Sequence, residues 1–292
     1  MTKNIFYKRE AQIEFNVQFG FEKVKISILK VYLSARDFPR VLLSSGNYGK
    51  VYQADINYVS FAIKSQTITS QDRAHLNSSI DEIIKEICFY KIASSLRFGP
   101  AYHRIFGFDI LLFDDSIEFA MEVCDRNRGH PERMESDLMQ GLKLMHSLNI
   151  VHRDIKDANI SWSPTFSKWV FLDFGFATFL KQSTGQKSKT KFIGTYNWAS
   201  DELKKLSLLK TWGWVDFYYN DLQATQKVVT LFQERVAESE SDSSRADDWT
   251  NIHALKKVDR IMDNHLDFRS WCSFFRVKYC LFKFTSLENL IL

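Results

Sequence analysis

The sequence predicts an α+β protein built as two lobes, with a strand-rich front half and a helical back half. Apolar residues alternate with a period of two over much of the first 124 residues, whereas helical spacing begins near residue 136. The 292 residues, 45% of them hydrophobic, are enough for two units and a sizeable core. With 11 Gly and 4 Pro but 25 Phe, the composition excludes collagen-like and low-complexity chains and indicates a bulky core.

The front half is expected to contain strands and one helix. Alternation over 13–21 and 24–28 predicts two strands that form a hairpin between Gly20 and Lys23. Residues 39–64 are typical of two more strands, joined by a turn at 46–49. The polar stretch 65–79 is expected to lead into a helix at about 80–95. Two apolar stretches within 106–123, split by a pair of aspartates, predict another hairpin.

The back half changes to helical spacing. Leu138, Leu142 and Met145 fall at i, i+4 and i+7, which predicts an amphipathic helix with Ser136 as its N-cap. A second helix is expected at about 220–237. The acidic, Ser-rich stretch 238–248 is interpreted as a solvated loop. Residues 251–292 begin with a helical pattern and end in an apolar, aromatic stretch, and no internal repeat is present.

Charge and cysteine usage limit the functional classes. The net charge of +4 is too small for a nucleic-acid binder without a concentrated basic patch, so no nucleic acid is expected as a partner. The four cysteines show no metal-type spacing and lie in apolar stretches, which favours buried free thiols over zinc or disulfides. No signal peptide and no run of about 18 apolar residues is seen, so we expect a cytoplasmic or nuclear protein without membrane insertion.

The strongest chemical signal is the segment VHRDIKDANI at 151–160. It places His152, Arg153 and Asp154 just before Lys156 and Asn159, which is the H-R-D-x-x-x-x-N spacing of a phosphotransferase catalytic loop. Such a tripeptide also occurs by chance in ordinary loops, so its value depends on what accompanies it.

A second motif, DFG at 173–175, follows behind an apolar, strand-like run. The two motifs in this order and this close together are far more specific than either alone. Asp173 and Asn159 offer a carboxylate and an amide carbonyl, which are hard oxygen ligands for a metal that carries phosphates. Asp154 can accept the proton of an incoming hydroxyl, and Lys156 can neutralise charge on the transferred phosphoryl group.

Upstream, LSSGNYGKV at 43–51 is similar to a Gly-rich phosphate loop, G-x-G-x-x-G-x-V. Gly46, Gly49 and Val51 match this pattern, whereas Ser44 replaces its first glycine. The two glycines allow the backbone to approach a phosphate closely. Taken alone, the match suits an ordinary hairpin turn equally well.

The segment FAIK at 61–64 strengthens that interpretation, because Lys64 falls where V-A-I-K places a phosphate-binding lysine. A single lysine at the end of a strand is otherwise a solvated charge. Lys64 needs a carboxylate partner from the following helix, and Glu82 and Glu86 are both candidates because they share one helical face.

In this order, the motifs resemble those of eukaryotic-type protein kinases over about residues 40–235. Three segments are similar to the casein kinase one family, namely EICFYKI at 86–92, GTYNWAS at 194–200 and NDLQ at 220–223. The resemblance favours Glu86 over Glu82 as the partner of Lys64. It also implies that Asp221 braces the backbone of the catalytic loop, and that Lys156 with Thr195 belongs to a Ser/Thr kinase.

The resemblance implies a bilobal protein-kinase fold of the α+β class. Its expected parts are an N-terminal extension at 1–37 whose strands pack on the small lobe, a small lobe at 38–124, and a large lobe at 125–292 that is shortened at its end. It further implies ATP with Mg²⁺ or Mn²⁺, protein substrates with Ser or Thr acceptors, and a monomer. The expected catalytic residues are Asp154, Lys156, Asn159 and Thr195, and the expected metal ligands are Asn159 and Asp173. The expected nucleotide-binding residues are Ser44, Gly46, Gly49, Val51, Ala62, Lys64, Glu86, Met121, Glu122, Val123 and Cys124.

Three departures from the kinase pattern keep other functions open. Ser44 replaces a glycine, residues 124–136 leave little room for the usual helix after the hinge, and few residues follow Asp221. These departures motivate a pseudokinase or scaffold as the alternative, which would bind nucleotide or partners without catalysis. A small-molecule kinase of similar fold is a third possibility, which Lys156 and the GTYNWAS segment disfavour.

The segment KQSTGQKSKTK at 181–191 is basic and polar. A phosphate on one of its Ser or Thr residues would pair with Arg153, and a solvated loop that needs no phosphate is the alternative. We hypothesise that its lysines favour acidic or phosphorylated substrates. Further along, Glu202 resembles the glutamate of the Ala-Pro-Glu motif, with Arg269 or Arg276 as candidate partners.

Overall fold

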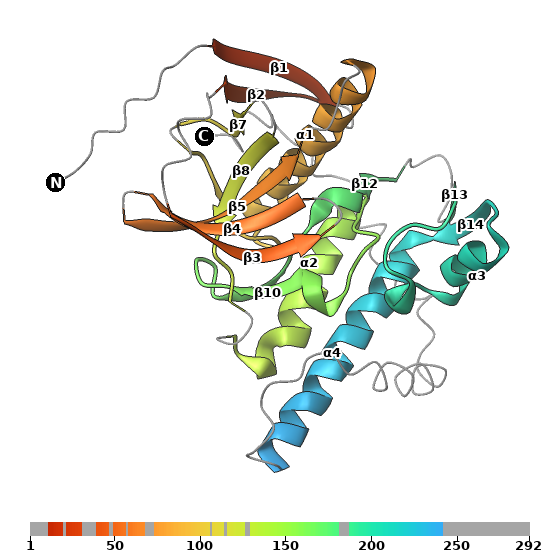
Figure 1. Ribbon diagram of the computed structural model, residues 1–292. Coiled ribbons are helices and arrows are strands. Elements are labelled where there is room, and N and C mark those ends of the chain that lie inside the picture. The colour runs from red at the N-terminus through yellow and green to blue at the C-terminus, as the bar shows by residue number, and fades with distance from the viewer. Residues whose placement is uncertain are drawn as a thin grey trace.

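The computed structural model describes residues 11–19, 22–30, 39–46, 49–56, 58–67, 73–105, 107–113, 116–125, 129–180 and 187–241. Over these residues the chain forms a strand-rich lobe and a helical lobe (Figure 1). The predicted α+β class and the bilobal arrangement are therefore confirmed.

The small lobe is built on one large sheet in the order β1-β2-β7-β8-β5-β4-β3, with β6 paired to β8. All neighbours are antiparallel except β2 and β7, which are parallel. The strands are β1 (Ala11–Phe19), β2 (Glu22–Lys30), β3 (Arg40–Gly46), β4 (Gly49–Ile56), β5 (Val59–Thr67), β6 (Tyr102–His103), β7 (Ile110–Leu112) and β8 (Ser116–Glu122).

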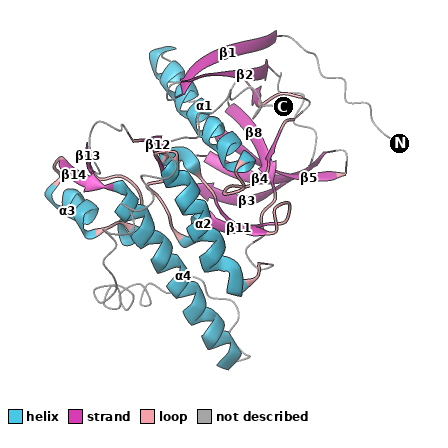
Figure 2. Cartoon of the chain, turned by 180° about the vertical axis from the view of Figure 1, so that it is seen from behind, coloured by secondary structure: helices cyan, strands magenta, loops and turns pink. Residues whose placement is uncertain are grey.

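One long helix, α1 (Arg73–Ser95), crosses the sheet of the small lobe (Figure 2). Its residues Ile83, Ile84 and Ile87 are buried in a cluster with Ile117 and Phe119 of β8. This apolar contact fixes α1 against the sheet, so that Glu86 of α1 reaches Lys64 of β5.

The large lobe is formed by helices with short two-stranded sheets. Its helices are α2 (Met134–Ser147), α3 (Asp201–Leu209) and α4 (Phe217–Ser241), with the 3-10 turns η2 (Pro131–Arg133), η3 (Asp157–Asn159), η4 (Phe174–Phe176) and η6 (Tyr196–Trp198). The strands pair as β9 (Ile150–Val151) with β12 (Thr178–Phe179), β10 (Ile160–Ser163) with β11 (Lys168–Phe171), and β13 (Lys187–Thr190) with β14 (Gly213–Asp216). None of the helices in the described ranges is long and apolar enough to cross a membrane.

Phenylalanine side chains fill the space where the two lobes meet. Phe98, Phe171 and Phe174 are buried in the same cluster as Phe119 of the small-lobe sheet. Phe174 stands edge-on to Phe98 and Tyr90, with ring centroids 6.1 Å and 5.1 Å apart. The Phe-rich composition thus serves a core that is continuous between the lobes and lies directly behind the DFG segment.

Two expectations for the front half need correction. Residues 39–64 contribute to three strands rather than two, because the chain turns again after β4, where Tyr58 adopts a left-handed conformation with φ of 65°. The helix expected at about 80–95 begins at Arg73. Leu76 and Ile80 do follow helical spacing with Ile83, but the other residues of these first turns are mostly polar, which weakens the helical signal.

Two expectations for the back half also need correction. Ser136 is not an N-cap, since α2 begins at Met134 and the Ser136 hydroxyl donates to Arg133 O inside the first turn. The predicted acidic loop 238–248 is helical up to Ser241, where α4 ends. The remaining residues of that loop and the stretch 251–292, with Cys272 and Cys280, lie outside the described residues.

The hairpin of β1 and β2 adds to the sheet at the outer edge of β7. Asp109, which lies just before β7, adds polar contacts between this hairpin and the rest of the small lobe. Its buried carboxylate accepts hydrogen bonds from the backbone N and the hydroxyl of Ser27, at 3.1 Å and 3.0 Å. The same carboxylate forms ion pairs with Lys91 of α1 at 2.7 Å and with Arg104 at 3.1 Å. Asp109 therefore joins the added hairpin to the helix α1.

Candidate active site

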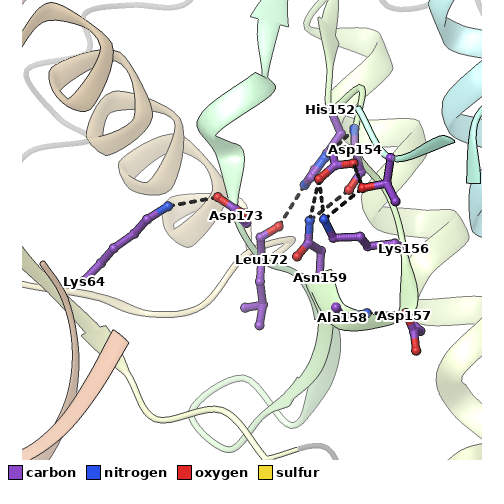
Figure 3. Close-up of polar contacts among 10 residues, drawn as sticks. Lys64, His152, Asp154, Lys156, Asp157, Ala158, Asn159, Leu172 and Asp173 are labelled. Atoms are coloured by element: carbon purple, nitrogen blue, oxygen red, sulfur yellow. Dashed lines mark hydrogen bonds and ion pairs between the residues drawn. The ribbon is translucent and has the colours of Figure 1, made fainter. Parts of the chain in front are cut away.

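The catalytic loop predicted at 151–160 leaves β9 and ends in η3, so that its polar side chains converge on Asp154 (Figure 3). The Asp154 carboxylate is buried and accepts hydrogen bonds from Lys156 Nζ at 2.7 Å and Thr195 Oγ1 at 2.7 Å. Lys156 Nζ also donates to Thr195 Oγ1 at 3.0 Å. Asn159 Nδ2 donates to the backbone oxygen of Asp154 at 2.9 Å. All four predicted catalytic residues are thus brought together.

A close backbone approach allows Thr195 to reach Asp154. Gly194 has φ of 93°, and a Cβ added there would lie 2.3 Å from the backbone oxygen of Arg153. Only glycine fits this position without displacing the catalytic loop. The glycine of the GTYNWAS segment is therefore required to join that segment to the site.

The backbone of the catalytic loop is held from below by Asp221 of α4. Its fully buried carboxylate accepts hydrogen bonds from His152 N at 2.6 Å and Arg153 N at 2.9 Å. Arg153 needs this support because it adopts a left-handed φ of 68°, which is costly for a residue with a Cβ. The expected brace by Asp221 is observed.

Ionic contacts join the two lobes where β5, α1 and the DFG segment meet. Lys64 of β5 lies 2.5 Å from Glu86 Oε1 and 2.9 Å from Asp173 Oδ1. Burial alone would lower the pKa of Lys64, but the two carboxylates outweigh it and hold that pKa well above its usual value. Burial acts to raise the pKa of Asp173, and Lys64 overcomes it, so the pKa stays below the ordinary value. Lys64 is therefore cationic and Asp173 anionic, and Glu82 is exposed on α1.

Tyr90 is a site residue that the motifs did not reveal. Asp173 occupies the left-handed region with φ of 59°, and its backbone N donates to the Tyr90 hydroxyl at 2.9 Å. The Tyr90 ring packs edge-on against Phe174 of the same motif. Tyr90 follows Glu86 by one helical turn. Two signals could have found it, namely this i, i+4 position on the face of α1 that carries Glu86 and its place in the EICFYKI segment.

The Gly-rich segment forms the tip of the β3–β4 hairpin, where Gly46 and Gly49 are register partners. Gly49 has φ of 124°, and a Cβ there would lie 2.5 Å from Ser65 O of the neighbouring strand, so glycine is required. Ser44 and Gly46 are exposed at this tip. The described contacts do not link the hairpin to the catalytic loop.

The residues expected around the adenine base lie on adjacent strands. Ala62 of β5 is the register partner of Met121 of β8, and both are buried. Val51 of β4 packs at the edge of the same apolar cluster. Val123 and Cys124 follow β8 and are partly buried, and burial raises the pKa of the Cys124 thiol. This places an apolar wall beside Lys64.

Glu122 has a structural use that sequence reasoning did not foresee. Its buried carboxylate accepts hydrogen bonds from Ala101 N at 2.6 Å, Ser163 Oγ at 2.5 Å and Thr165 N at 3.0 Å. Its backbone N donates to Ala101 O at 2.9 Å. The side chain and the backbone N of Glu122 are therefore both engaged within the protein, and its carbonyl oxygen is the group left to contact a nucleotide. The side chain connects the end of β8 to the β10–β11 turn.

The donor set fits a magnesium ion bound together with phosphates. Asp173 supplies a carboxylate, and both described hydrogen bonds of the Asn159 side chain use its Nδ2, which leaves Oδ1 for a cation. Within the described residues no group of three or more His, Cys, Asp or Glu forms a metal site by itself. Mg²⁺ characteristically takes one or two protein oxygens and completes its shell with phosphate and water, so this sparse set is appropriate.

Part of the basic segment 181–191 is seen as β13, and it places lysine beside Glu202. Lys187 Nζ lies 2.7 Å from Glu202 Oε1. Glu202 therefore has a partner in the segment itself, while Arg269 and Arg276 lie outside the described residues. Arg153 Nε donates to Phe176 O at 2.6 Å, just after the DFG segment.

Comparison with known proteins agrees with this geometry. Residues 40–210 match the family model described as protein kinase domain. The chain is 30% identical over 65% of its length to the serine/threonine-protein kinase pakG of Dictyostelium discoideum. It is 26% identical over 55% of its length to the serine/threonine-protein kinase 4 homolog A of the same organism, and 26% identical over 68% to the MDIS1-interacting receptor like kinase 2 of Arabidopsis thaliana.

The matched regions cover only 16%, 35% and 21% of those three relatives, respectively. The similarity therefore concerns the domain rather than the whole relatives. The family match spans more than half of the chain and includes the Lys64–Glu86 pair, the catalytic loop and the DFG segment. This chain belongs to the protein kinase domain family.

Proposed function

We propose that the protein is an active, ATP-dependent protein kinase that transfers the γ-phosphoryl group to Ser or Thr hydroxyls of protein substrates. The observation that carries this proposal is the convergence of Lys156 and Thr195 on the buried carboxylate of Asp154. This combination is the one expected of Ser/Thr kinases. The names of two similar proteins, both serine/threonine-protein kinases, support the same class.

Asp154 is proposed as the group that orients the acceptor hydroxyl and takes its proton. Its carboxylate is held by hydrogen bonds on both oxygens, so it is fixed before a substrate arrives. Lys156, adjacent to it, would stabilise negative charge on the phosphoryl group in transit. Such positioning and electrostatic stabilisation account for most of the catalysis in phosphoryl transfer.

ATP with Mg²⁺ or Mn²⁺ supplies the phosphoryl group and the charge neutralisation that this domain family implies. Lys64, oriented by Glu86, would bind the α- and β-phosphates. Asp173 and Asn159 would hold the metal. The tip of the β3–β4 hairpin would cover the phosphates, and Ala62 and Met121 would enclose the adenine base together with Val51 and the backbone of residues 122–124.

The decisive test is the Asp154→Ala variant in an assay with radiolabelled ATP, Mg²⁺ and casein. Transfer is expected to fall by about 10²-fold or more because the proton acceptor is lost. Nucleotide binding, measured separately by calorimetry, should survive, since Asp154 lies on the acceptor side of the site. An unchanged transfer rate would refute the assignment of Asp154.

A pseudokinase or scaffold is the alternative that a specific observation favours, because Ser44 replaces a glycine at the hairpin tip. A wild-type protein that binds ATP yet labels no substrate would establish that alternative. A resemblance of segments 86–92, 194–200 and 220–223 to the casein kinase one family supports casein as the first substrate to try.

A further inference from the structure

Four large apolar side chains within residues 208–214 are exposed on the large lobe. They are Leu208 at 70%, Leu209 at 71%, Trp212 at 56% and Trp214 at 57%. Tryptophan is strongly buried on average, so two half-exposed tryptophans this close together are unusual. Exposed apolar side chains that are gathered in one short segment are typical of interaction sites on folded proteins.

The core of this region does not need these side chains. Helix α3 turns Leu203 and Leu206 inward, where they pack with Val215 and Phe217 in a buried cluster. Leu208 and Leu209 fall on the other side of the helix end. The fold of the region is thus complete without them, which leaves the exposed face free for another role.

Each of the two tryptophans has a lysine of the basic segment as a neighbour. Lys191 Nζ stands 5.2 Å from the centroid of the Trp212 ring. Lys189 is the direct cross-strand partner of Trp214 in the β13–β14 pair. Both lysines are exposed. We name the set Lys189, Lys191, Leu208, Leu209, Trp212 and Trp214 the basic–aromatic surface.

The charge around this surface is positive. Residues 187–216 contain six lysines and three acidic residues. Two of the acids are occupied, since Glu202 pairs with Lys187 and Asp201 pairs with Lys204. Over the part of the chain that the structure describes, Lys189 and Lys191 have no acidic partner. A ligand for this face therefore needs negative charge as well as apolar side chains.

The basic–aromatic surface is connected directly to the catalytic loop. Strand β13 and strand β14 lie with α3 at one side of the large lobe in both views (Figures 1 and 2). Lys191 is four residues before Thr195, which hydrogen bonds to Asp154. Four residues span at most about 14 Å, so a chain bound at the surface can reach the site without a long linker.

We propose that the basic–aromatic surface binds an acidic segment of the protein substrate that also carries apolar side chains, outside the residues around the acceptor hydroxyl. The lysines recognise its carboxylates, and the tryptophans and leucines cover its apolar side chains. This inference rests on the proposed kinase function for its biological meaning, whereas the binding itself does not require catalysis.

Continuity with the catalytic loop favours a substrate segment over a lipid surface. A membrane-binding face needs the same residue types but no connection to Asp154. The two possibilities separate in binding experiments, because a peptide in solution and an anionic vesicle are different probes.

The test uses the full chain and a fluorescein-labelled peptide of Asp, Glu, Leu and Trp, compared with a matched peptide of Asn, Gln, Leu and Trp. Fluorescence anisotropy is expected to show at least about tenfold tighter binding of the acidic peptide. Lys189→Glu with Lys191→Glu should abolish that preference and confer binding of a peptide in which the acids are replaced by lysine. Trp212→Ser with Trp214→Ser should weaken binding of both original peptides.

Matched controls come from one exposed and one half-buried residue away from this surface. Leu144→Ser on α2 and Lys168→Glu on β11 change similar chemistry and should leave binding unchanged. The thermal melting temperature of each variant reports whether it is folded, and a variant that does not fold is replaced by the single change Lys189→Gln. Equal affinity for the acidic and amide peptides would overturn the proposal, as would binding only to vesicles that contain phosphatidylserine.

A kinetic arm distinguishes this proposal from the proposed function. A Ser-containing substrate fused to the acidic segment should have a KM at least about tenfold lower than its amide counterpart, with kcat unchanged. If no substrate is phosphorylated but the acidic peptide still binds, the kinase proposal fails and the surface stands. If both substrates are phosphorylated with the same KM, the surface proposal fails and the kinase stands.

Discussion

Two buried pairs of lysine and carboxylate hold the same helix, and their surroundings give them different roles. Lys64 with Glu86 and Lys91 with Asp109 have nitrogen–oxygen distances of 2.5 Å and 2.7 Å, and each pair includes one residue of α1. In the first pair, Lys64 also reaches Asp173 of the DFG segment, whose side chain is 35% exposed. In the second, Asp109 is enclosed by Ser27 and Arg104 and is 1% exposed.

The comparison teaches that the chemistry of a pair does not decide its function. The Lys64 pair connects α1 to a group that can meet a ligand, so we assign it to the reaction. The Lys91 pair connects α1 to the β1–β2 hairpin, so we assign it to the fold. Helix α1 is thereby held at two points, by Lys64 of β5 and by Asp109 beside the added hairpin.

The largest effect on activity should come from breaking the pair of Lys64 and Glu86. In Lys64→Met, phosphoryl transfer is expected to fall by about 10²- to 10³-fold, because a preorganised cation at the phosphates is removed. The measurement is kcat/KM for ATP with the radiolabel assay. Lys91→Met provides the matched control, and it should keep most of its activity at a temperature where it is folded. Equal losses in the two variants would contradict the division of roles.

Breaking the pair of Lys91 and Asp109 should chiefly affect the stability of the protein. Asp109→Asn leaves the buried charge of Lys91 without its carboxylate and also removes the partner of the exposed Arg104, and it is expected to lower the free energy of unfolding by about 3 kcal/mol. Urea denaturation followed by circular dichroism measures this change. Glu132→Gln, at an exposed site, should change the free energy by less than about 0.5 kcal/mol. A stability loss no greater in Asp109→Asn than in Glu132→Gln would refute the structural role of Asp109.

The pH dependence of stability gives a second test of the structural role of Asp109. Burial acts to raise the pKa of Asp109, but Lys91, Ser27 and Arg104 hold it below its ordinary value. A depressed folded-state pKa contributes stability above the unfolded value of about 3.9, and this contribution is lost as pH falls through the folded pKa. The difference in unfolding free energy between wild type and Asp109→Asn should therefore be constant above about pH 5 and shrink below about pH 4. A difference that grows on acidification would have the wrong sign.

The smallest effect is expected from Tyr90→Phe. This change keeps the ring packing against Phe174 and removes only the hydroxyl that accepts from Asp173 N. The loss of one such hydrogen bond costs about 1 kcal/mol, so kcat should fall by about fivefold. Steady-state kinetics at saturating ATP measures it, and the affinity for a nucleotide without metal should not change. A fall as large as that of Lys64→Met would mean that Tyr90 does more than position Asp173.

The sequence predicted which residues come together around Asp154 because most of them lie in short motifs with fixed spacing. Asp154, Lys156 and Asn159 are near neighbours in the chain, and Lys64 closes the FAIK segment within β5. The pair of Ser27 and Asp109 was not predicted, because the two residues are 82 positions apart and belong to no motif. The contacts of the Glu122 carboxylate were not predicted for the same reason, since its partners lie in two segments that are 21 to 43 residues away in the chain.

The fold was predicted where apolar periodicity is strong and missed where it is weak. The alternation over 13–28 matched the observed β1–β2 hairpin. The early turns of α1 are mostly polar, so the helical spacing of Leu76 and Ile80 with Ile83 is only a weak signal. The exposed tryptophans at 212 and 214 also follow no core pattern, and only the structure shows that they are not needed for packing.

Phosphoryl transfer by wild type and Asp173→Ala, assayed side by side, tests the central claim most directly. Both proteins are incubated with γ-labelled ATP, Mg²⁺ and casein, and the product is hydrolysed for phosphoamino-acid analysis. We predict label on phosphoserine or phosphothreonine with wild type and a loss of about 10²-fold or more with Asp173→Ala, because the metal ligand is removed. Equal labelling by the two proteins, or none by the wild type, would contradict the account.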